Sequence, residues 1–137
     1  MELVALSRGR RKIVQAIVVS VVVGACGVSS EDRENFLQAT AGIEWTEEQR
    51  LTAGERVCEF LVDWQAEWYL GGEGDPMYLA FDDLYFMTRS AGATRQQANA
   101  LHGSAVEFLC QDDFHRDTWS YWIRTTDLEG LERGGYP

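Results

Sequence analysis

Few side chains in this sequence are of the types that carry out chemistry. His102 and His115 are the only imidazoles, and neither lies in a known nucleophile or metal-binding motif. The adjacent pairs Asp82-Asp83 and Asp112-Asp113 lack the spacing of a calcium-binding loop, and neighbouring side chains on a helix point in different directions. We expect solvated acidic faces there, and His102 at a boundary of the core rather than acting as a base. We therefore expect no catalytic residue, no metal site, no cofactor and no enzyme.

The cysteine at position 26 has more specific surroundings. It ends the run Val23-Gly24-Ala25-Cys26, which resembles a bacterial lipobox: an aliphatic residue, two small residues and a cysteine. Small side chains let a signal peptidase bind the backbone in extended form, and the thiol accepts a diacylglyceryl group through a thioether bond. The resemblance implies that Cys26 is lipidated and becomes the N-terminus of the mature chain.

The residues before this cysteine have the pattern of an export leader. A basic cluster, Arg8 to Lys12, precedes the apolar run Ile13 to Val23. These are the n-region and h-region of a signal peptide, and the basic end stays in the cytoplasm, so the rest of the chain is delivered outside. We expect the protein at the outer face of the cytoplasmic membrane, held by its lipid.

Three other interpretations of the leader stay open. An uncleaved single-pass anchor would need about twenty apolar residues, whereas Ile13 to Val28 is sixteen residues long. An ordinary secretory peptide would be cut elsewhere and leave Cys26 as an incidental thiol. Arg10-Arg11 weakly resembles a twin-arginine signal, but Gly9 replaces the usual polar residue, which favours the general secretory route.

The other two cysteines, Cys58 and Cys110, form an even pair in a chain with an export leader. Export favours a disulfide between them, and the alternative is a pair of buried thiols in helix cores. Closing a loop of about fifty residues would stabilise the fold by roughly 4 kcal/mol on the entropic model. No C-x-x-C spacing is present, so the expected bond is structural rather than redox-active.

Five tryptophans are many for so small a chain. Core packing is one explanation, because small bundles need large apolar side chains. The alternative is a partly exposed aromatic patch that stacks on a glycan or anchors a protein partner. We expect Trp64 in the core and Trp68 partly exposed. The candidate partner-binding residues are Trp64, Trp68, Trp119 and Trp122.

Composition and charge limit the class of protein. The chain has 137 residues, 45% of them apolar and only two of them proline, which suits one globular domain. The leader has four basic residues and one acid, so its removal changes the formal net charge from -10 to -13. Such a surface repels phosphate backbones and anionic lipid headgroups, so we expect no nucleic-acid partner and a membrane attachment that depends on the lipid.

Hydrophobic periodicity predicts helices throughout the exported part. The first starts near Glu31, capped by Ser29 or Ser30, and ends near Gly42. The second opens at a capping box over 46–49 and runs to about Leu70.

Two further helices and a tail are expected after the glycine-rich break at 71–74. One helix begins at Asp75-Pro76 and ends at Ala91-Gly92. The next opens at a second capping box, 94–97, and reaches Cys110, and a short helix around Trp119 to Ile123 follows. The expected fold is an all-α bundle of four to five helices linked by one disulfide behind a signal peptide. Its parts are a leader over 1–25, a lipidated tether over 26–30, an acidic helical domain over 31–125 and a flexible tail over 126–137.

Several segments resemble a known group of proteins: Phe36-Leu37, Gly42-Ile43, Gly54 to Cys58, Thr94 to Ala98 and Ala105 to Cys110. They are similar to a family of small exported mycobacterial proteins of unknown function, over roughly residues 33 to 110. The resemblance implies a compact all-helical domain, often behind a signal peptide or lipobox, with one cysteine in each of two helices. It also implies a Cys58–Cys110 bridge and no known activity.

Three function classes follow in order of preference. The first is a tethered binding or interaction module at the cell envelope with a protein or glycan partner, because the acidity, the aromatic residues and the absence of catalytic motifs in the sequence all fit it. The second is a phage-type superinfection-exclusion lipoprotein, which no residue separates from the first. The third is an envelope enzyme, which would need a deep cleft with convergent polar groups.

Overall fold

The computed structural model describes residues 27–71 and 76–134, with the side chains of residues 68–71 excepted. Within these residues the chain is all-α, as expected, and contains no strand. The described residues form six α-helices rather than the expected four or five: α2 (Ser30–Ala39), α3 (Glu47–Gly71), α4 (Leu79–Ser90), α5 (Arg95–Ser104), α6 (Asp113–Thr125) and α7 (Leu128–Gly134). A short π-helix, η1 (Ala105–Leu109), continues α5.

The helix starts follow the capping signals in the sequence. Ser29 caps α2, since its hydroxyl accepts a hydrogen bond from the backbone N–H of Asp32 at 3.0 Å. Both predicted capping boxes are present. At the start of α3, Thr46 and Gln49 each accept from the other's backbone N–H, at 3.1 and 3.0 Å. At the start of α5, Thr94 and Gln97 do the same at 3.1 and 2.9 Å.

Two helix ends differ from the sequence-based expectation. The first helix ends at Ala39 instead of near Gly42, because Arg50 from α3 donates to the carbonyl oxygen of Leu37 at 2.7 Å and to the hydroxyl of Thr40 at 3.1 Å. A cation at a helix C-terminus satisfies the free carbonyl groups there. The helix expected from Pro76 begins only at Leu79, since 76–78 form a tight turn in which Leu79 N–H donates to the carbonyl of Pro76.

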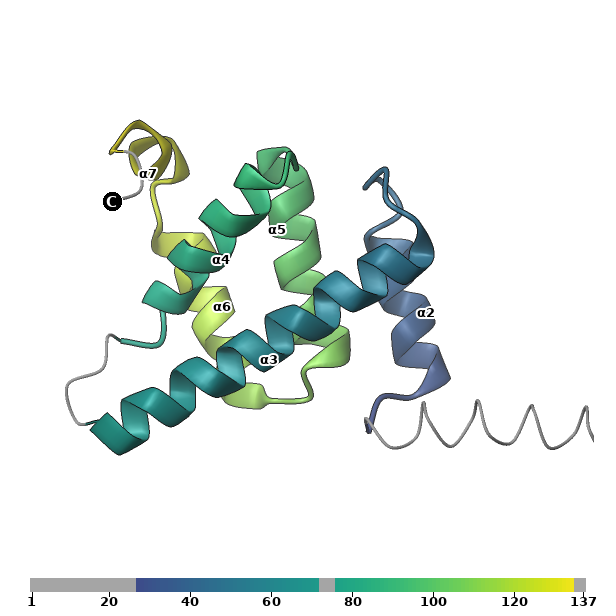
Figure 1. The fold of residues 1–137 in the computed structure, drawn as a ribbon, viewed down its shortest axis with the longest axis horizontal. Helices are drawn as coiled ribbons and strands as arrows, with labels where there is room; N and C mark the ends of the chain where they lie inside the picture. Colours follow the sequence, from purple (N-terminus) through teal and green to yellow (C-terminus); the bar gives the residue numbers. More distant parts are fainter. Residues whose placement is uncertain (1–26, 72–75, 135–137) are drawn as a thin grey trace, which may run out of the picture.

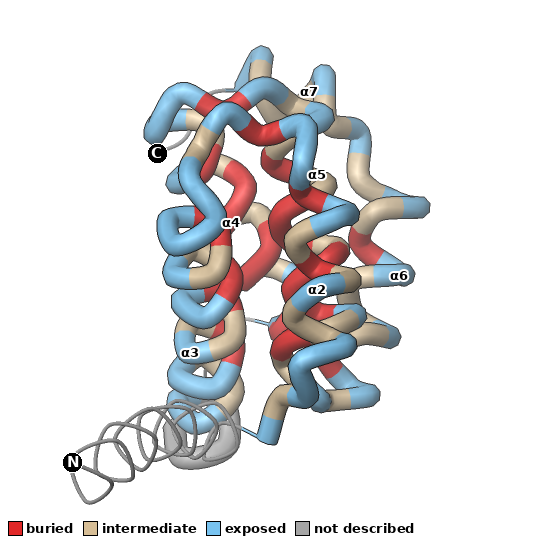
Figure 2. The backbone as a smooth tube through the Cα atoms, turned by 90° about the vertical axis from the view of Figure 1, so that its right-hand side faces the viewer, coloured by how far each residue is buried: buried red, intermediate tan, exposed pale blue. Residues whose placement is uncertain are grey.

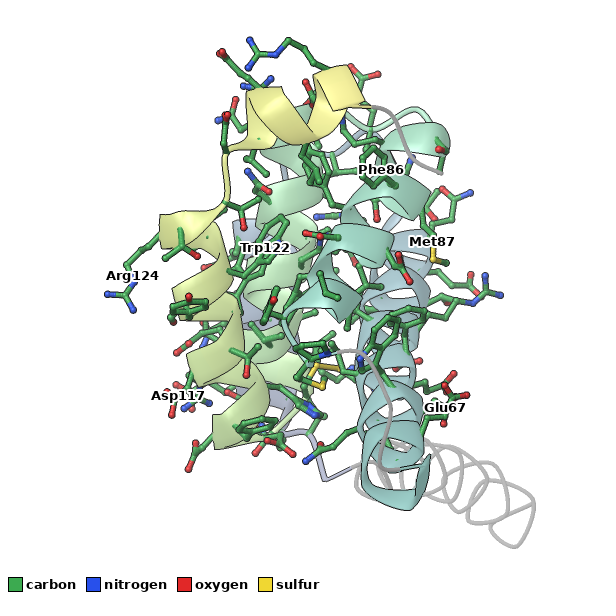
Figure 3. The ribbon with its side chains drawn as sticks, turned by 90° about the vertical axis from the view of Figure 1, so that its left-hand side faces the viewer. Glu67, Phe86, Met87, Asp117, Trp122 and Arg124 are labelled. Carbon is green, nitrogen blue, oxygen red and sulfur yellow. A yellow bond between two sulfur atoms is a disulfide. The ribbon has the colours of Figure 1, made fainter. Side chains whose placement is uncertain are left out.

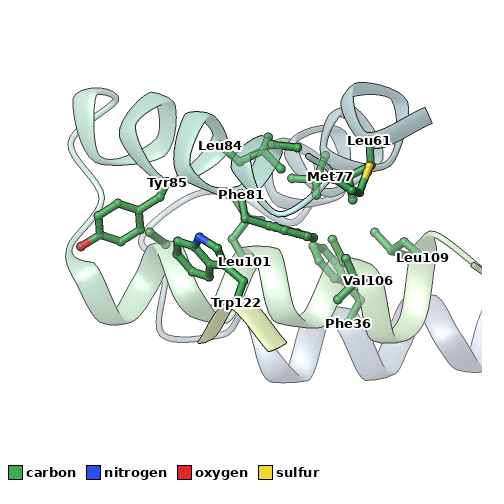
Figure 4. Close-up of a cluster of buried hydrophobic side chains, with 14 of the residues drawn as sticks. Phe36, Leu61, Met77, Phe81, Leu84, Tyr85, Leu101, Val106, Leu109 and Trp122 are labelled. Atoms are coloured by element: carbon green, nitrogen blue, oxygen red, sulfur yellow. The ribbon is translucent and has the colours of Figure 1, made fainter. Parts of the chain in front are cut away.

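The long helix α3 crosses the structure and packs against α2, α4, α5 and η1 (Figure 1). Helices α3 and α4 lie on one side, α2, α5 and α6 lie on the other, and the buried parts of the chain face one another between them (Figure 2). The core joins residues from all of these helices (Figure 4). Among its largest fully buried side chains are Phe36, Leu61, Phe81, Tyr85, Val106 and Trp122.

The close approach of α2 and η1 to α3 depends on Gly54, which lies in the first third of α3. A Cβ atom at this position would lie 2.6 Å from Leu109 and 2.7 Å from the ring of Phe36. These are side chains of η1 and α2, so a residue with no Cβ lets both pack directly on the backbone of α3.

A Cys58–Cys110 disulfide joins α3 to the residue that follows η1, as expected (Figure 3). Its Cα atoms are 5.0 Å apart. The last turn before it is π-helical, with Cys110 N–H donating to the carbonyl of Ala105 at 2.9 Å, and Gln111 then adopts a positive φ of 53°. Together these features redirect the chain from α5 into α6.

The last helix, α7, occupies part of the stretch expected to be a flexible tail over 126–137. Glu132 holds it to α4 and α5: its carboxylate accepts from Tyr85 Oη, from Arg89 Nε at 3.2 Å and from Arg95 Nη2 at 2.7 Å. The Arg95 and Tyr85 hydrogen bonds lower the pKa of Glu132 to about 2. A carboxylate with three donors from two helices orders a segment whose small apolar content would not do so alone.

Candidate functional site

The candidate tryptophans whose side chains the structure describes are Trp64, Trp119 and Trp122, and they differ in burial. Trp122 is 1% exposed, stacks on Trp119 with ring centroids 5.3 Å apart, and donates from Nε1 to Asp82 Oδ1 at 2.7 Å. Figure 3 shows it between α6 and α4. A side chain with so little exposed area offers no contact to a partner, so the structure places Trp122 in the core and corrects its assignment as a candidate binding residue.

The other three candidate tryptophans differ in position. Trp119 is partly buried against the core, where it also packs edge-on to His102. Trp64 is partly buried against the core as well, with its ring 5.8 Å from that of Phe60. The side chain of Trp68 lies outside the described residues, as do Val23, Gly24, Ala25 and Cys26 of the lipobox.

Both histidines are buried inside the helix bundle, which corrects the expectation that His102 lies at its boundary. His102 is fully buried, its Nε2 lies 2.7 Å from Thr88 Oγ1, and its Nδ1 has no hydrogen-bond partner. Burial lowers its pKa to about 3. It is therefore a neutral imidazole that joins α5 to α4.

His115 joins two helices in a similar way. Its Nε2 lies 2.7 Å from Gln65 Oε1 of α3, so a hydrogen bond links α6 to α3. Burial lowers the pKa of His115, while the carboxylate of Asp112 opposes that change. Asp112 itself caps α6 by accepting from the backbone N–H of His115 at 3.1 Å.

No group of three or more potential metal ligands occurs in the part of the chain that the structure describes. One residue of each acidic pair has a structural contact: Asp82 accepts from Trp122, and Asp112 caps α6.

A groove of about 790 Å³ lies between α3 and α4, and we call it the α3–α4 groove. Its floor is formed by the buried side chains Val57, Leu84 and Leu101. Its apolar walls come from the partly buried Trp45, Ala53 and Phe60 and from the exposed Met87 and Ala91. Its polar and charged lining residues are Glu48, Gln49, Thr52, Arg56, Glu59, Asp63 and Thr88.

Met87 is the most exposed large apolar residue on this groove. Its side chain is 58% exposed, and it lies on the side of α4 away from Trp122 (Figure 3). The flexible, polarizable side chain of methionine suits a surface that adapts to a bound helix or peptide. An exposed apolar residue beside an apolar hollow marks a place where a partner can remove nonpolar area from water.

The α3–α4 groove is not among the sites predicted from the sequence, since the tryptophan that lines it, Trp45, is not one of the predicted contact residues. One signal was available: Met87 stands outside the buried stripe of α4, which contains Phe81, Leu84, Tyr85 and Thr88. An apolar residue off the core face of an amphipathic helix is a candidate contact residue. The opposite wall, which α3 contributes, could not be inferred from the sequence, because it depends on how α3 crosses α4.

Within residues 27–71 and 76–134, no helix combines the length and the apolarity needed to cross a bilayer. No known protein family, no curated protein and no solved structure matches this chain. The candidate site is therefore defined by its geometry and not by similarity to a known protein. It is an apolar groove with an acidic edge in a disulfide-linked helical bundle.

Proposed function

We propose that this protein is a membrane-anchored extracytoplasmic lipoprotein that binds a protein partner at the cell envelope through the α3–α4 groove. The observation that carries the binding half of the proposal is the groove itself, with Met87 exposed at its edge and Phe60 and Trp45 in its walls. An open, apolar hollow between two helices is a recurrent site for helical partners.

Two features support the envelope location. The leader over 1–25 and the lipobox ending in Cys26 have the pattern of an exported and lipidated chain. The Cys58–Cys110 disulfide suits an oxidising compartment, because cytoplasmic thiols are kept reduced.

The binding half is tested by photo-cross-linking in cells that make the full chain. A photoreactive amino acid is placed at Met87 in one strain and at Val62 in another. Val62 is a matched control, because it is 56% exposed and is not among the residues that line the groove. We expect a defined cross-linked protein from position 87 and not from position 62.

A second substitution checks that the groove is responsible. Thr52 is exposed and lines the groove, so Thr52→Trp fills part of it without entering the core. We expect this change to suppress the cross-link from position 87. Identical cross-linking patterns from positions 87 and 62, or a pattern at position 87 that Thr52→Trp leaves unchanged, would reject the groove as the binding site. Cross-linking to glycan instead of protein would reject the proposed class of partner.

A further inference from the structure

The two walls of the α3–α4 groove differ in charge. Among the described residues that line it, every charged one lies on α3: Glu48, Arg56, Glu59 and Asp63. Helix α4 contributes Leu84, Met87 and Thr88, which are uncharged, and Ala91 follows its end. A bound segment therefore meets an apolar surface on one side and a charged edge on the other.

The charges on α3 are also ordered along the helix. Glu48 lies near the start of α3, Arg56 follows it, and Glu59 and Asp63 lie beyond Arg56. Glu48 and Asp63 are fifteen residues apart, which corresponds to about 22 Å along an α-helix. Along about four helical turns, the charges on this edge of α3 are therefore first acidic, then basic, then acidic.

The apolar lining of the groove favours a helical occupant over an extended one. An extended peptide would need backbone partners for its N–H and C=O groups, and the described part of this chain has no strand edge to provide them. Its backbone would instead lie against the apolar side chains of Phe60, Leu84 and Met87, which cannot satisfy the N–H and C=O groups of a peptide. A helix satisfies its own backbone and presents only side chains to the groove.

We propose that the occupant is an amphipathic helix of about four turns, with an apolar stripe that packs on Phe60 and Met87 and with basic residues at both ends of the edge that faces α3. A carboxylate or amide near the middle of that edge would face Arg56. This inference rests on the proposed function and specifies the chemistry of its partner. The acidic surface of the mature chain also favours a basic partner, because opposite charge speeds encounter and suppresses acidic competitors.

The inference is tested with three synthetic peptides of about sixteen residues, a length that spans the groove. The first has a leucine stripe at helical spacing, lysines at both ends and a central glutamate. The second keeps the stripe but has glutamates at both ends and a central lysine. The third has the composition of the first with the stripe scrambled. The receptor is the full lipidated chain in phosphatidylcholine nanodiscs, and empty nanodiscs are the blank.

We expect the first peptide to bind at least about tenfold more tightly than the other two, and to become helical when bound, as followed by calorimetry and by chemical shifts of the labelled peptide. Met87→Glu should weaken its binding by about tenfold or more, whereas Val62→Glu should change it by less than about twofold. The double variant Glu59→Lys/Asp63→Lys should weaken the preference for the first peptide over the second, because it reverses the charge at one end of the edge while Glu48 and Arg56 are unchanged.

Equal affinities for all three peptides, an extended bound conformation, or equal effects of Met87→Glu and Val62→Glu would overturn the inferred occupant. The cross-link from position 87 separates this failure from failure of the proposed function. If that cross-link persists while the peptides show no preference, the groove binds a partner of other chemistry. If both are absent, the groove is not a binding site.

Discussion

Trp119 and Trp122 stack on each other with ring centroids 5.3 Å apart, and Phe81 packs against both of them. Truncation of Trp122 to alanine should therefore leave a large cavity and cost about 3 to 5 kcal/mol of unfolding free energy. Tyr121→Ala is the matched control, since Tyr121 is its neighbour on α6 and is 53% exposed. We expect the control to change stability by less than about 1 kcal/mol. Urea denaturation followed by far-UV circular dichroism measures both, and equal losses would place Trp122 outside the core.

Glu132 makes the thermal stability of the fold depend on pH in the acid range. Its pKa falls from 4.5 to about 2 in the folded chain, because Arg95 and Tyr85 donate hydrogen bonds to its carboxylate. A depressed carboxyl pKa contributes stability above pH 4.5 that is lost as the pH falls toward 2. Glu132→Gln should thus melt at a lower temperature than the native chain at pH 7, and the difference should shrink between pH 4.5 and 2.5.

The control for that variant is Glu129→Gln, because Glu129 is 70% exposed and lies 3.8 Å from Arg95. It should have a small effect at every pH. A difference between Glu132→Gln and the native chain that stays constant from pH 7 to 2.5 would show that the carboxylate charge is not what holds α7.

His102 affects stability in a different range of pH. Burial lowers its pKa from 6.5 to about 3, so below pH 6.5 the unfolded chain takes up a proton that the folded chain does not. Stability should fall as the pH drops from 6.5 to 5, with a slope of up to about 1.4 kcal/mol per pH unit from this residue. His115 adds to the slope in the same direction, since its pKa is also lowered.

His102→Gln removes the titrating group and keeps a side chain that can hydrogen-bond Thr88. We expect the loss of stability between pH 6.5 and 5 to become shallower in this variant, even if its stability at pH 7.5 is lower. Chemical denaturation at each pH measures the slope. An unchanged slope would mean that His102 takes up its proton without unfolding.

Local signals in the sequence predicted the helices well where a cap defines them. Ser29, Thr46 and Thr94 each form the predicted hydrogen bonds, because a cap involves only residues three positions apart. The Cys58–Cys110 disulfide was also predictable, because the lipobox pattern assigns Cys26 to a different role and leaves an even pair of cysteines.

Features that depend on distant residues were not predictable in this way. Arg50 ends α2 from thirteen residues away, and Glu132 orders α7 through donors on α4 and α5. The burial of His102 depends on Thr88 and Trp119, which lie on two other helices. The α3–α4 groove belongs to the same category, because its floor exists only where Val57, Leu84 and Leu101 meet.

Substitution of Gly54 tests how tightly α2 and η1 pack on α3 near the disulfide. A Cβ atom there would overlap Leu109 and Phe36, so Gly54→Ala should destabilise the fold by about 1 to 3 kcal/mol in spite of the better helix propensity of alanine. Gly42→Ala is the control, since nothing lies within 4 Å of a Cβ atom at that position. Thermal melting of the two variants compares them directly. A Gly54→Ala variant as stable as the native chain would show that α2 and η1 can move away from α3 at no cost.

The most direct measurement of the envelope proposal is mass spectrometry of the N-terminal peptide of the mature protein, purified from the membrane fraction of cells that make the full chain. The lipobox predicts a peptide that begins at Cys26 and carries a thioether-linked diacylglyceryl group, and no lipid on the Cys26→Ser variant. A peptide that still contains the leader over 1–25, or one that carries Cys26 as an unmodified thiol, would contradict the proposal that lipid on Cys26 holds this protein at the cell envelope.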